Sequence, residues 1–280
     1  MIGGGYGDRE FVERELAAAD MNQVGIGFIT WSLRGKEEVF DLAMKRRPRA
    51  VFLSFGDPSP YIPAIRAAGS KLICQVQTVA DAEKAADLGV DVIVAQGTEA
   101  GGHGAARSTM ALVPAVVDAV SPIPVLAAGG IADGRGIAAA LMLGAQGVVL
   151  GTRFLTTPES LAHANAKARI VTESGDHTVR TRVFDIVRGR DWPYEYTGRA
   201  IRNAFTDRWH GNEDGLASAM DREAPKFAAA VAQGDVDNGL IFAGEAIDLI
   251  HDRHPVAQVM ADLVHETAAA LRGSDELLKI

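Results

Sequence analysis

One histidine, His103, stands in a glycine-rich segment that directly follows an apolar run. The segment reads VAQGTEAGGHG over residues 94–104. A histidine that follows the C-terminal end of a buried strand can act as a general base or bind an anion. Because Gly102 and Gly104 flank it, we expect His103 to lack the packed neighbours of a structural histidine. Glu99 is expected either to orient His103 or to cap the helix that follows.

Two glycine clusters after later apolar runs have the composition of a phosphate site. The first is AAGGI at 127–131 and the second is LGTRF at 150–154. Glycine lets the backbone approach a ligand closely, and N–H groups at such turns can bind phosphate. The clusters lie one strand–helix unit apart, and the loops after the last two strands of an α/β barrel frequently form a phosphate site. We therefore predict that both clusters bind one phosphate group.

The elements that would position these groups alternate between short apolar runs and amphipathic segments. Helical patterns such as residues 80–88 separate the runs, and this alternation implies βαβ crossovers and a parallel sheet. The runs predict seven strands buried on both faces, at 1–4, 23–30, 50–54, 71–76, 91–95, 123–128 and 146–150. A closed barrel has eight strands. The sequence therefore predicts an α/β fold of the TIM (β/α)8 type that lacks one strand.

The pattern changes after residue 157. A helix is expected over 158–170, and a loop-rich stretch over 171–215. Further helical patterns follow at 217–233, 241–251 and 255–272. We expect a barrel core over residues 1–170, with a mainly helical elaboration over 171–280 packed on it as part of a single domain.

Composition and charge exclude several classes of function. The formal net charge is −8 and no run is rich in Lys and Arg, which argues against nucleic acid or an anionic membrane as partner. The single cysteine, Cys74, excludes a disulfide within the chain and a multi-cysteine metal site, and it is expected to pack as a small hydrophobe. No apolar stretch reaches about 18 residues, so we expect a cytoplasmic protein. The other histidines show no ligand spacing, and no metal site is expected.

Taken together, these segments resemble the nitronate monooxygenase family, whose older name is 2-nitropropane dioxygenase. The similarity is strongest in the motifs AQGTEAGGHG at 95–104, AAGGIADG at 127–134 and LGTRFL at 150–155. It continues through TES at 172–174 and TRVFD at 181–185 to AGEA at 243–246, so it covers nearly the whole chain.

The resemblance implies that the chain binds FMN and oxidises alkyl nitronates with molecular oxygen, and it leaves open whether nitroalkanes are substrates too. It implies that His103 is the catalytic base or pairs with the nitro group. Gln75 occupies a position from which a polar side chain reaches the flavin ring; without the resemblance, its amide is equally compatible with burial against backbone groups. The other residues expected to contact FMN are Gly102, Ala128, Gly129, Gly130, Gly151 and Thr152. A homodimer is one expected assembly.

The sequence also departs from the family pattern. Residues 1–8 resemble the segment at the family's second strand, so the resemblance implies that the missing strand is the first and that residue 1 is internal to the ancestral domain. Either the start is misassigned or the barrel is a shortened form. Glycine in GIGF at 25–28 stands where many relatives have asparagine near the flavin. Two other functions stay open: an FMN-dependent NAD(P)H reductase of enoyl thioesters or quinones, and an inactive, N-terminally truncated flavin-binding homologue. A barrel like that of IMP dehydrogenase is disfavoured because residues 96–108 contain no cysteine nucleophile.

Overall fold

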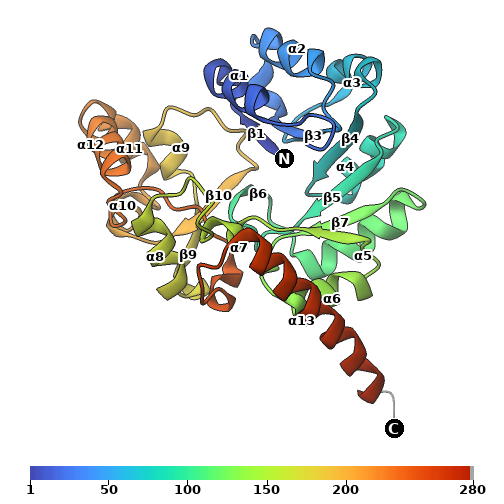
Figure 1. The fold of residues 1–280 in the computed structure, drawn as a ribbon. Helices are drawn as coiled ribbons and strands as arrows, with labels where there is room; N and C mark the ends of the chain where they lie inside the picture. The colour runs from blue at the N-terminus through green and yellow to red at the C-terminus, as the bar shows by residue number, and fades with distance from the viewer. Residues whose placement is uncertain (278–280) are drawn as a thin grey trace. The chain divides into compact units, whose positions relative to one another are not determined.

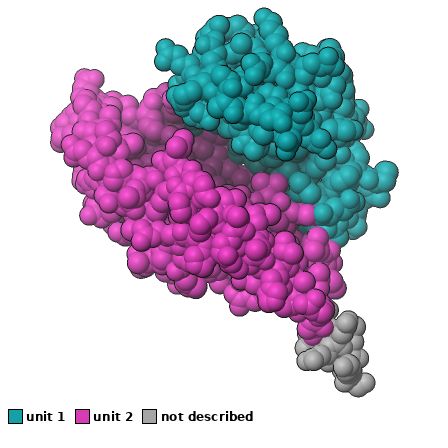
Figure 2. Space-filling view, viewed as in Figure 1, with its two compact units in different colours: residues 1–95, 112–126, 144–146 teal, residues 96–111, 127–143, 147–280 magenta. Residues whose placement is uncertain are grey.

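The structure is a computed structural model that describes residues 1–277 and the side chains as far as residue 273. The chain forms two compact units, which Figure 2 distinguishes by colour. Unit 1 contains residues 1–95, 112–126 and 144–146, and unit 2 contains residues 96–111, 127–143 and the chain from 147 onward. The division expected at residue 170 stays a prediction.

The main sheet contains the seven strands that the sequence predicts, in the order β1-β2-β3-β4-β5-β7-β8 (Figure 1). The pairings from β1 to β5 are parallel. This order follows the chain and agrees with the barrel-like α/β class, whereas the lost first strand stays a prediction. The strands are β1 (Ile2–Gly5), β2 (Ile26–Ile29), β3 (Ala50–Ser54), β4 (Lys71–Val76), β5 (Val92–Gln96), β7 (Val125–Ala128) and β8 (Gly147–Val149).

Local capping and strand burial organise unit 1. Thr78 caps the helix after β4 by accepting a hydrogen bond from the Asp81 backbone, and Gly69 ends the preceding helix in the left-handed conformation that glycine favours. Cys74 on β4 is 4% exposed, which confirms that it packs in the core, and burial raises the pKa of its thiol to about 12. The helices of the first 120 residues are α1 (Arg9–Ala18), α2 (Glu37–Lys45), α3 (Ile62–Ala68), α4 (Val79–Asp87) and α5 (Thr109–Val120).

Unit 2 contains a second, antiparallel sheet that the sequence did not predict. It consists of β6 (Gly102–Gly104), β10 (Thr197–Ile201) and β9 (Thr178–Thr181), in that order. β6 is three residues long and includes two glycines, and β9 contains arginine and threonine where a buried strand would be apolar. The local pattern therefore gave no strand signal.

The helices of unit 2 largely follow the predicted pattern. The predicted helix at 158–170 corresponds to α8, which begins only at Ala164. The predicted loop-rich stretch contains β9, β10, the short helices α9 and α10 and the start of α11. The full set is α6 (Gly134–Met142), α7 (Thr152–Leu155), α8 (Ala164–Thr172), α9 (Val183–Val187), α10 (Ala204–Trp209), α11 (Glu213–Ser218), α12 (Met220–Gln233) and α13 (Val256–Leu277).

The predicted helix at 241–251 is wrong. Residues 245–249 form only a 3₁₀ turn, and Phe242 forms a β-bridge with Ala200 of β10. Ile241 accepts a hydrogen bond from the backbone N–H of Ile201, so the chain here runs extended beside β10. Ile241 and Ala243 are buried by alternation along this extended part, whereas Ile247 and Ile250 are buried in and just after the 3₁₀ turn.

In residues 1–277, no helix combines the length and apolar character needed to cross a membrane. The same part of the chain contains no group of three or more His, Cys, Asp or Glu side chains arranged to hold a metal ion.

Candidate active site

His103 lies in a packed interior and not on an open loop. It is 7% exposed and sits on β6, opposite Gly198 of β10. Its ring stacks on Trp192, with centroids 3.5 Å apart and planes 4° apart, and it meets the edge of Phe242 at 5.4 Å. The expectation that His103 lacks packed neighbours is therefore wrong. Gly198, opposite His103, leaves room for the ring of Phe242, because a Cβ atom there would lie 2.8 Å from Phe242 Cε1.

A buried carboxylate bonds to this histidine. Nε2 of His103 lies 2.9 Å from Oδ2 of Asp185, and Asp185 is 2% exposed. The other carboxylate oxygen accepts a hydrogen bond of 2.9 Å from Arg188 Nη2. Burial lowers the pKa of His103; Asp185 opposes this shift, while Arg188 and Arg180 reinforce it. The pKa stays below its ordinary value, so the imidazole is mainly neutral at neutral pH.

Two arginines fix the segment that carries His103. Arg180 donates through Nε and Nη2 to the carbonyl oxygen of Thr98, at 3.0 and 2.8 Å, and Arg199 Nε donates to the same oxygen at 3.0 Å. Arg180 Nη1 also donates to the carbonyl oxygen of Gly104 at 3.1 Å. Burial, with the positive charge of Arg199 beside it, lowers the pKa of Arg180 to about 10. Thr98 and Gly104 of the segment are thus held by one half-buried side chain.

Glu99 caps a helix. Its carboxylate accepts hydrogen bonds from the backbone N–H and the hydroxyl of Thr109, the first residue of α5, at 2.9 and 2.7 Å. A carboxylate at a helix N-terminus is a favourable cap. Of the two roles expected for Glu99, the structure confirms the capping role.

The first predicted phosphate loop packs tightly against this segment. Gly129 and Gly130 have φ angles of +102° and +69°, where glycine is favoured. A Cβ atom at Gly129 would lie 3.0 Å from the carbonyl oxygen of Gly97, and one at Gly130 would lie 3.0 Å from Cβ of Glu99. Both positions therefore require glycine for conformation and for space.

The second predicted loop adjoins the same segment through Gly244. The hydroxyl oxygen of Thr152 accepts a hydrogen bond of 3.0 Å from the Gly244 backbone. A Cβ atom at Gly244 would lie 2.7 Å from the carbonyl oxygen of Glu99, which also accepts a hydrogen bond from Glu245. The side chain of Glu99 therefore lies beside the first loop. Its carbonyl group lies beside Gly244, which is the hydrogen-bond partner of Thr152 in the second loop.

The backbone donors of both loops are available to a ligand. Within residues 1–277, no protein acceptor is found for the N–H groups of Gly129, Gly130, Gly151 and Thr152. A Cβ atom at Gly151 would meet no heavy atom within 4 Å. An anion could therefore approach these donors closely, which is the property that a phosphate-binding loop needs.

The N-terminus of α6 is already capped and adds little to such a site. Asp133 accepts a hydrogen bond of 3.0 Å from the Gly136 backbone, and Glu266 of α13 accepts one of 2.9 Å from Gly134. Two carboxylates thus compensate the positive end of this helix. Phosphate binding here would depend on the loop amides.

The remaining predicted residues are placed as follows. Gly102 has a φ angle of +75° and open space beside it, and the carbonyl oxygen of Ala128 accepts a hydrogen bond of 2.9 Å from Gly97. Gln75 is half-buried at the end of β4 in unit 1. All the other predicted site residues belong to unit 2.

Sequence reasoning missed Asp185, Trp192 and Phe242. Asp185 lies 82 positions from His103, and no local spacing connects the two residues. The TRVFD segment was noticeable as a motif, but only the folded chain shows that its Asp contacts the histidine and that Trp192 stacks on it.

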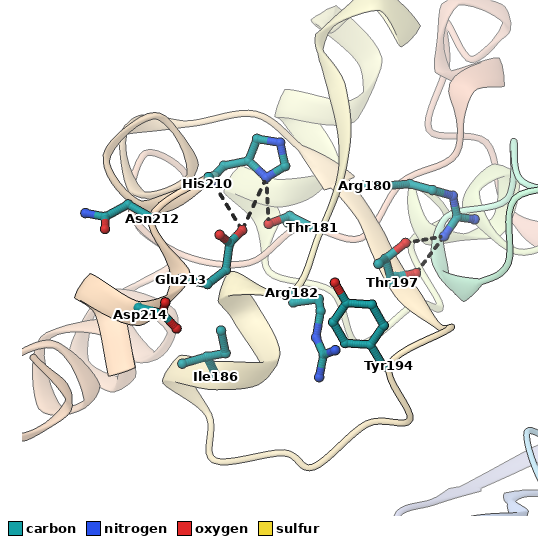
Figure 3. A pocket seen from close by; sticks show the side chains of 11 residues that line it. Arg180, Thr181, Arg182, Ile186, Tyr194, Thr197, His210, Asn212, Glu213 and Asp214 are labelled. Atoms are coloured by element: carbon teal, nitrogen blue, oxygen red, sulfur yellow. Dashed lines mark hydrogen bonds and ion pairs between the residues drawn. The ribbon is translucent and has the colours of Figure 1, made fainter. Parts of the chain in front are cut away.

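A cavity of about 530 Å³ opens beside the loop that carries Trp192 (Figure 3). Arg182 lines this cavity with its guanidinium carbon 4.6 Å from the ring centroid of Tyr194, and it donates to the carbonyl oxygen of Trp192 at 3.3 Å. None of the predicted site residues lines the cavity. Arg182 therefore anchors the loop that covers His103.

Comparison with known proteins gives a consistent result. The profile of the nitronate monooxygenase family matches residues 13–266. A nitronate monooxygenase from Neurospora crassa is 34% identical over 262 residues, covering 84% of this chain and 68% of that protein.

Solved structures agree with this result. FabK from Thermotoga maritima has a TM-score of 0.82 at 30% identity, over 96% of this chain and 83% of that one. A nitroalkane oxidase from Streptomyces ansochromogenes has a TM-score of 0.81 at 25% identity, over 97% and 88%. The chain belongs to the nitronate monooxygenase family of flavin-dependent oxidoreductases.

Proposed function

We propose that this chain oxidises alkyl nitronates, and the nitroalkanes from which they form, with molecular oxygen and bound FMN. The observation that carries the proposal is a buried histidine with a lowered pKa, on the segment that two glycine loops with available backbone donors adjoin. The match to the family over residues 13–266 and the nitronate monooxygenase relative support the same reaction. The partners are then a small-molecule substrate and oxygen, and a homodimer stays a prediction.

In this proposal the loop amides of unit 2 bind the FMN phosphate. The donors are the N–H groups of Gly129, Gly130, Gly151 and Thr152, with Gly102 and Ala128 beside the cofactor. That Gln75 of unit 1 contacts the flavin ring stays a prediction from the sequence. FMN, when bound, accepts electrons from the nitronate and passes them to oxygen. The protein holds donor and acceptor in contact and orients them.

His103 is the proposed base for neutral nitroalkanes. The C–H bond next to the nitro group breaks, its proton goes to the imidazole, and the electron pair remains delocalised over the resulting nitronate. A neutral imidazole is the form able to accept this proton, which agrees with the lowered pKa of His103. For a substrate supplied as nitronate, the proton transfer has already occurred.

The first experiment is an absorbance spectrum of the purified protein with identification of the released flavin, followed by oxygen consumption with an alkyl nitronate and with its nitroalkane. We expect bound FMN and turnover of both substrates. His103→Asn should lower nitroalkane turnover by about 100-fold or more and leave FMN content unchanged. Bound FMN that bleaches rapidly under NADH or NADPH without oxygen would indicate the reductase, and bound FMN without either activity would indicate the inactive homologue.

A glycine substitution tests the phosphate site separately. Gly151→Ala places a methyl group where no protein atom lies within 4 Å, so the fold should be unchanged. The same methyl group would stand in the space proposed for the phosphate, and the FMN dissociation constant should rise about tenfold. Gly3→Ala on β1, which also meets no atom within 4 Å, is the matched control and should bind FMN as the parent does. Equal affinity in both variants would remove Gly151 from the site.

A further inference from the structure

The carboxylate of Asp185 is placed to control the state of His103. Asp185 is held in α9, whose neighbouring residues Val183 and Phe184 are buried in a hydrophobic cluster. Its backbone N–H donates to Arg182 at 2.9 Å, and its carbonyl oxygen accepts a hydrogen bond of 2.8 Å from Arg190. The carboxylate is thus fixed before any substrate arrives, and its Oδ2 lies 2.9 Å from His103 Nε2.

This contact determines which ring nitrogen carries the proton. An ionised carboxylate only accepts hydrogen bonds, so Nε2 of a neutral His103 must be the protonated nitrogen. Nδ1 then carries the lone pair. A histidine without such a partner would divide its population between two tautomers, and one of them could not accept a proton at Nδ1.

We propose that Asp185 is a positioning residue that holds the His103 ring in one orientation and one tautomer, so that Nδ1 is the atom that takes the proton of the nitroalkane substrate. This inference rests on the proposed function for its chemistry, and on the 2.9 Å contact between two buried side chains for its geometry.

The charged groups around the ring define the role of Arg188. Asp185 and Arg188 come from the α9 region and Arg180 comes from β9, while the packed rings of Trp192 and Phe242 carry no charge. Arg188 donates to the second oxygen of Asp185 at 2.9 Å and so compensates part of its charge. Asp185 can therefore orient His103 without holding it in the protonated form.

The direct test is nuclear magnetic resonance of protein labelled with ¹⁵N-histidine, with the His103 signals assigned by their absence in His103→Asn. We expect Nε2 protonated and Nδ1 unprotonated in the parent protein. Asp185→Asn should mix the tautomers and move the titration midpoint of His103 to lower pH, because the carboxylate that raises its pKa is gone. Arg188→Gln should move the midpoint to higher pH. A purely structural role would not produce opposite shifts.

Turnover gives the second readout. In Asp185→Asn, kcat/KM for a nitroalkane should fall by about 100-fold, with its acidic limb displaced to lower pH and FMN content unchanged. If folded Asp185→Asn kept the tautomer and the titration midpoint of His103, the proposal would be overturned. If Asp185→Asn does not fold, Arg188→Gln is the deciding variant, and an unchanged midpoint of His103 in it would count against the proposal. Should neither the parent nor any variant oxidise nitroalkanes, the proposed function fails while the spectra still decide what Asp185 does to His103.

Discussion

Trp192 covers one face of the His103 imidazole at a centroid distance of 3.5 Å, so a substrate has to approach from another side or displace the indole. Residues 188–196 around it form neither helix nor strand. Arg182 anchors this loop at the carbonyl group of Trp192 and beneath the exposed ring of Tyr194. The indole that shields the His103 imidazole from water therefore also limits the access of a substrate to it.

Replacing Trp192 should change both stability and the acidity of His103. Trp192 is 2% exposed, and Trp192→Ala should lower the free energy of unfolding by roughly 3–5 kcal/mol. Burial is the largest cause of the lowered pKa of His103, so that pKa should rise toward its ordinary value. Denaturant unfolding and histidine resonances measure the two effects. Tyr194→Ala, in the same loop at 82% exposure, is the control and should change neither by much.

At the scale of residues, the sequence revealed which groups could react but not what surrounds them. His103 and the glycine pairs are visible because the neighbouring residues in the chain are unusual for a core segment. The rings that bury His103 come from residues 192 and 242, and these contacts depend on pairing of β6 with β10. Patterns of hydrophobic periodicity contain no information about such nonlocal contacts.

Among the elements, α13 and α6 form a close pair that depends on one glycine (Figure 1). A Cβ atom at Gly134 would lie 2.2 Å from Cβ of Glu266 and 2.3 Å from the backbone nitrogen of Thr267. The close approach also lets Glu266 cap α6. Glycine at this position therefore serves helix packing and not a ligand.

Gly134→Ala should separate α13 from α6. The added methyl group meets backbone as well as side-chain atoms, so the helices have to shift, and we expect a loss of about 1–3 kcal/mol in the free energy of unfolding. Amide hydrogen exchange in α13 should accelerate. Gly273→Ala, in the same helix α13 with no heavy atom within 4 Å, is the matched control and should be neutral or slightly stabilising. Equal protection of α13 in both variants would show that the packing adapts without cost.

The elements differ in how well the sequence predicts them. Strands such as β3 and β4 are continuous apolar runs, and the seven strands of the main sheet all appear where these runs predicted them. β9 and β10 are held by arginine and backbone contacts to the His103 segment, which leave no periodic signal. The apolar residues at 241–243 suggested a helix because a short run does not distinguish helix from extended chain.

For the molecule as a whole, stability should fall in two stages as the solution becomes acidic. The folded-state pKa of His103 lies below 6.5, its ordinary value. At a pH between these two pKa values, the unfolded chain binds more protons than the folded chain. The contribution of neutral His103 to the free energy of unfolding is therefore complete above about pH 6.5, and it is lost as pH falls through the folded-state pKa. Burial opposes ionisation of Asp91, but hydrogen bonds from Lys71, Leu72 and Arg66 outweigh it and lower its pKa to about 2. The contribution of ionised Asp91 to the free energy of unfolding is lost only below pH 3.8.

Thermal unfolding measured from pH 8 to pH 2.5 tests this prediction. The melting temperature should fall first below about pH 6.5 and again below about pH 4. His103→Asn should remove the first decrease and keep the second. A first decrease of the same size in His103→Asn would assign it to another group.

The interleaving of the two units has a consequence for synthesis. A ribosome that has added residue 146 has made every residue of unit 1, but only two short pieces of unit 2, residues 96–111 and 127–143. Those pieces include His103 and the first glycine loop. Their hydrogen-bond partners Arg180, Arg199 and Asp185 are translated later. The candidate site therefore lacks these side chains at a stage when all the residues of unit 1 have been synthesised. A chain truncated after residue 146 would thus contain the histidine and one loop of the candidate site without the side chains that arrange them.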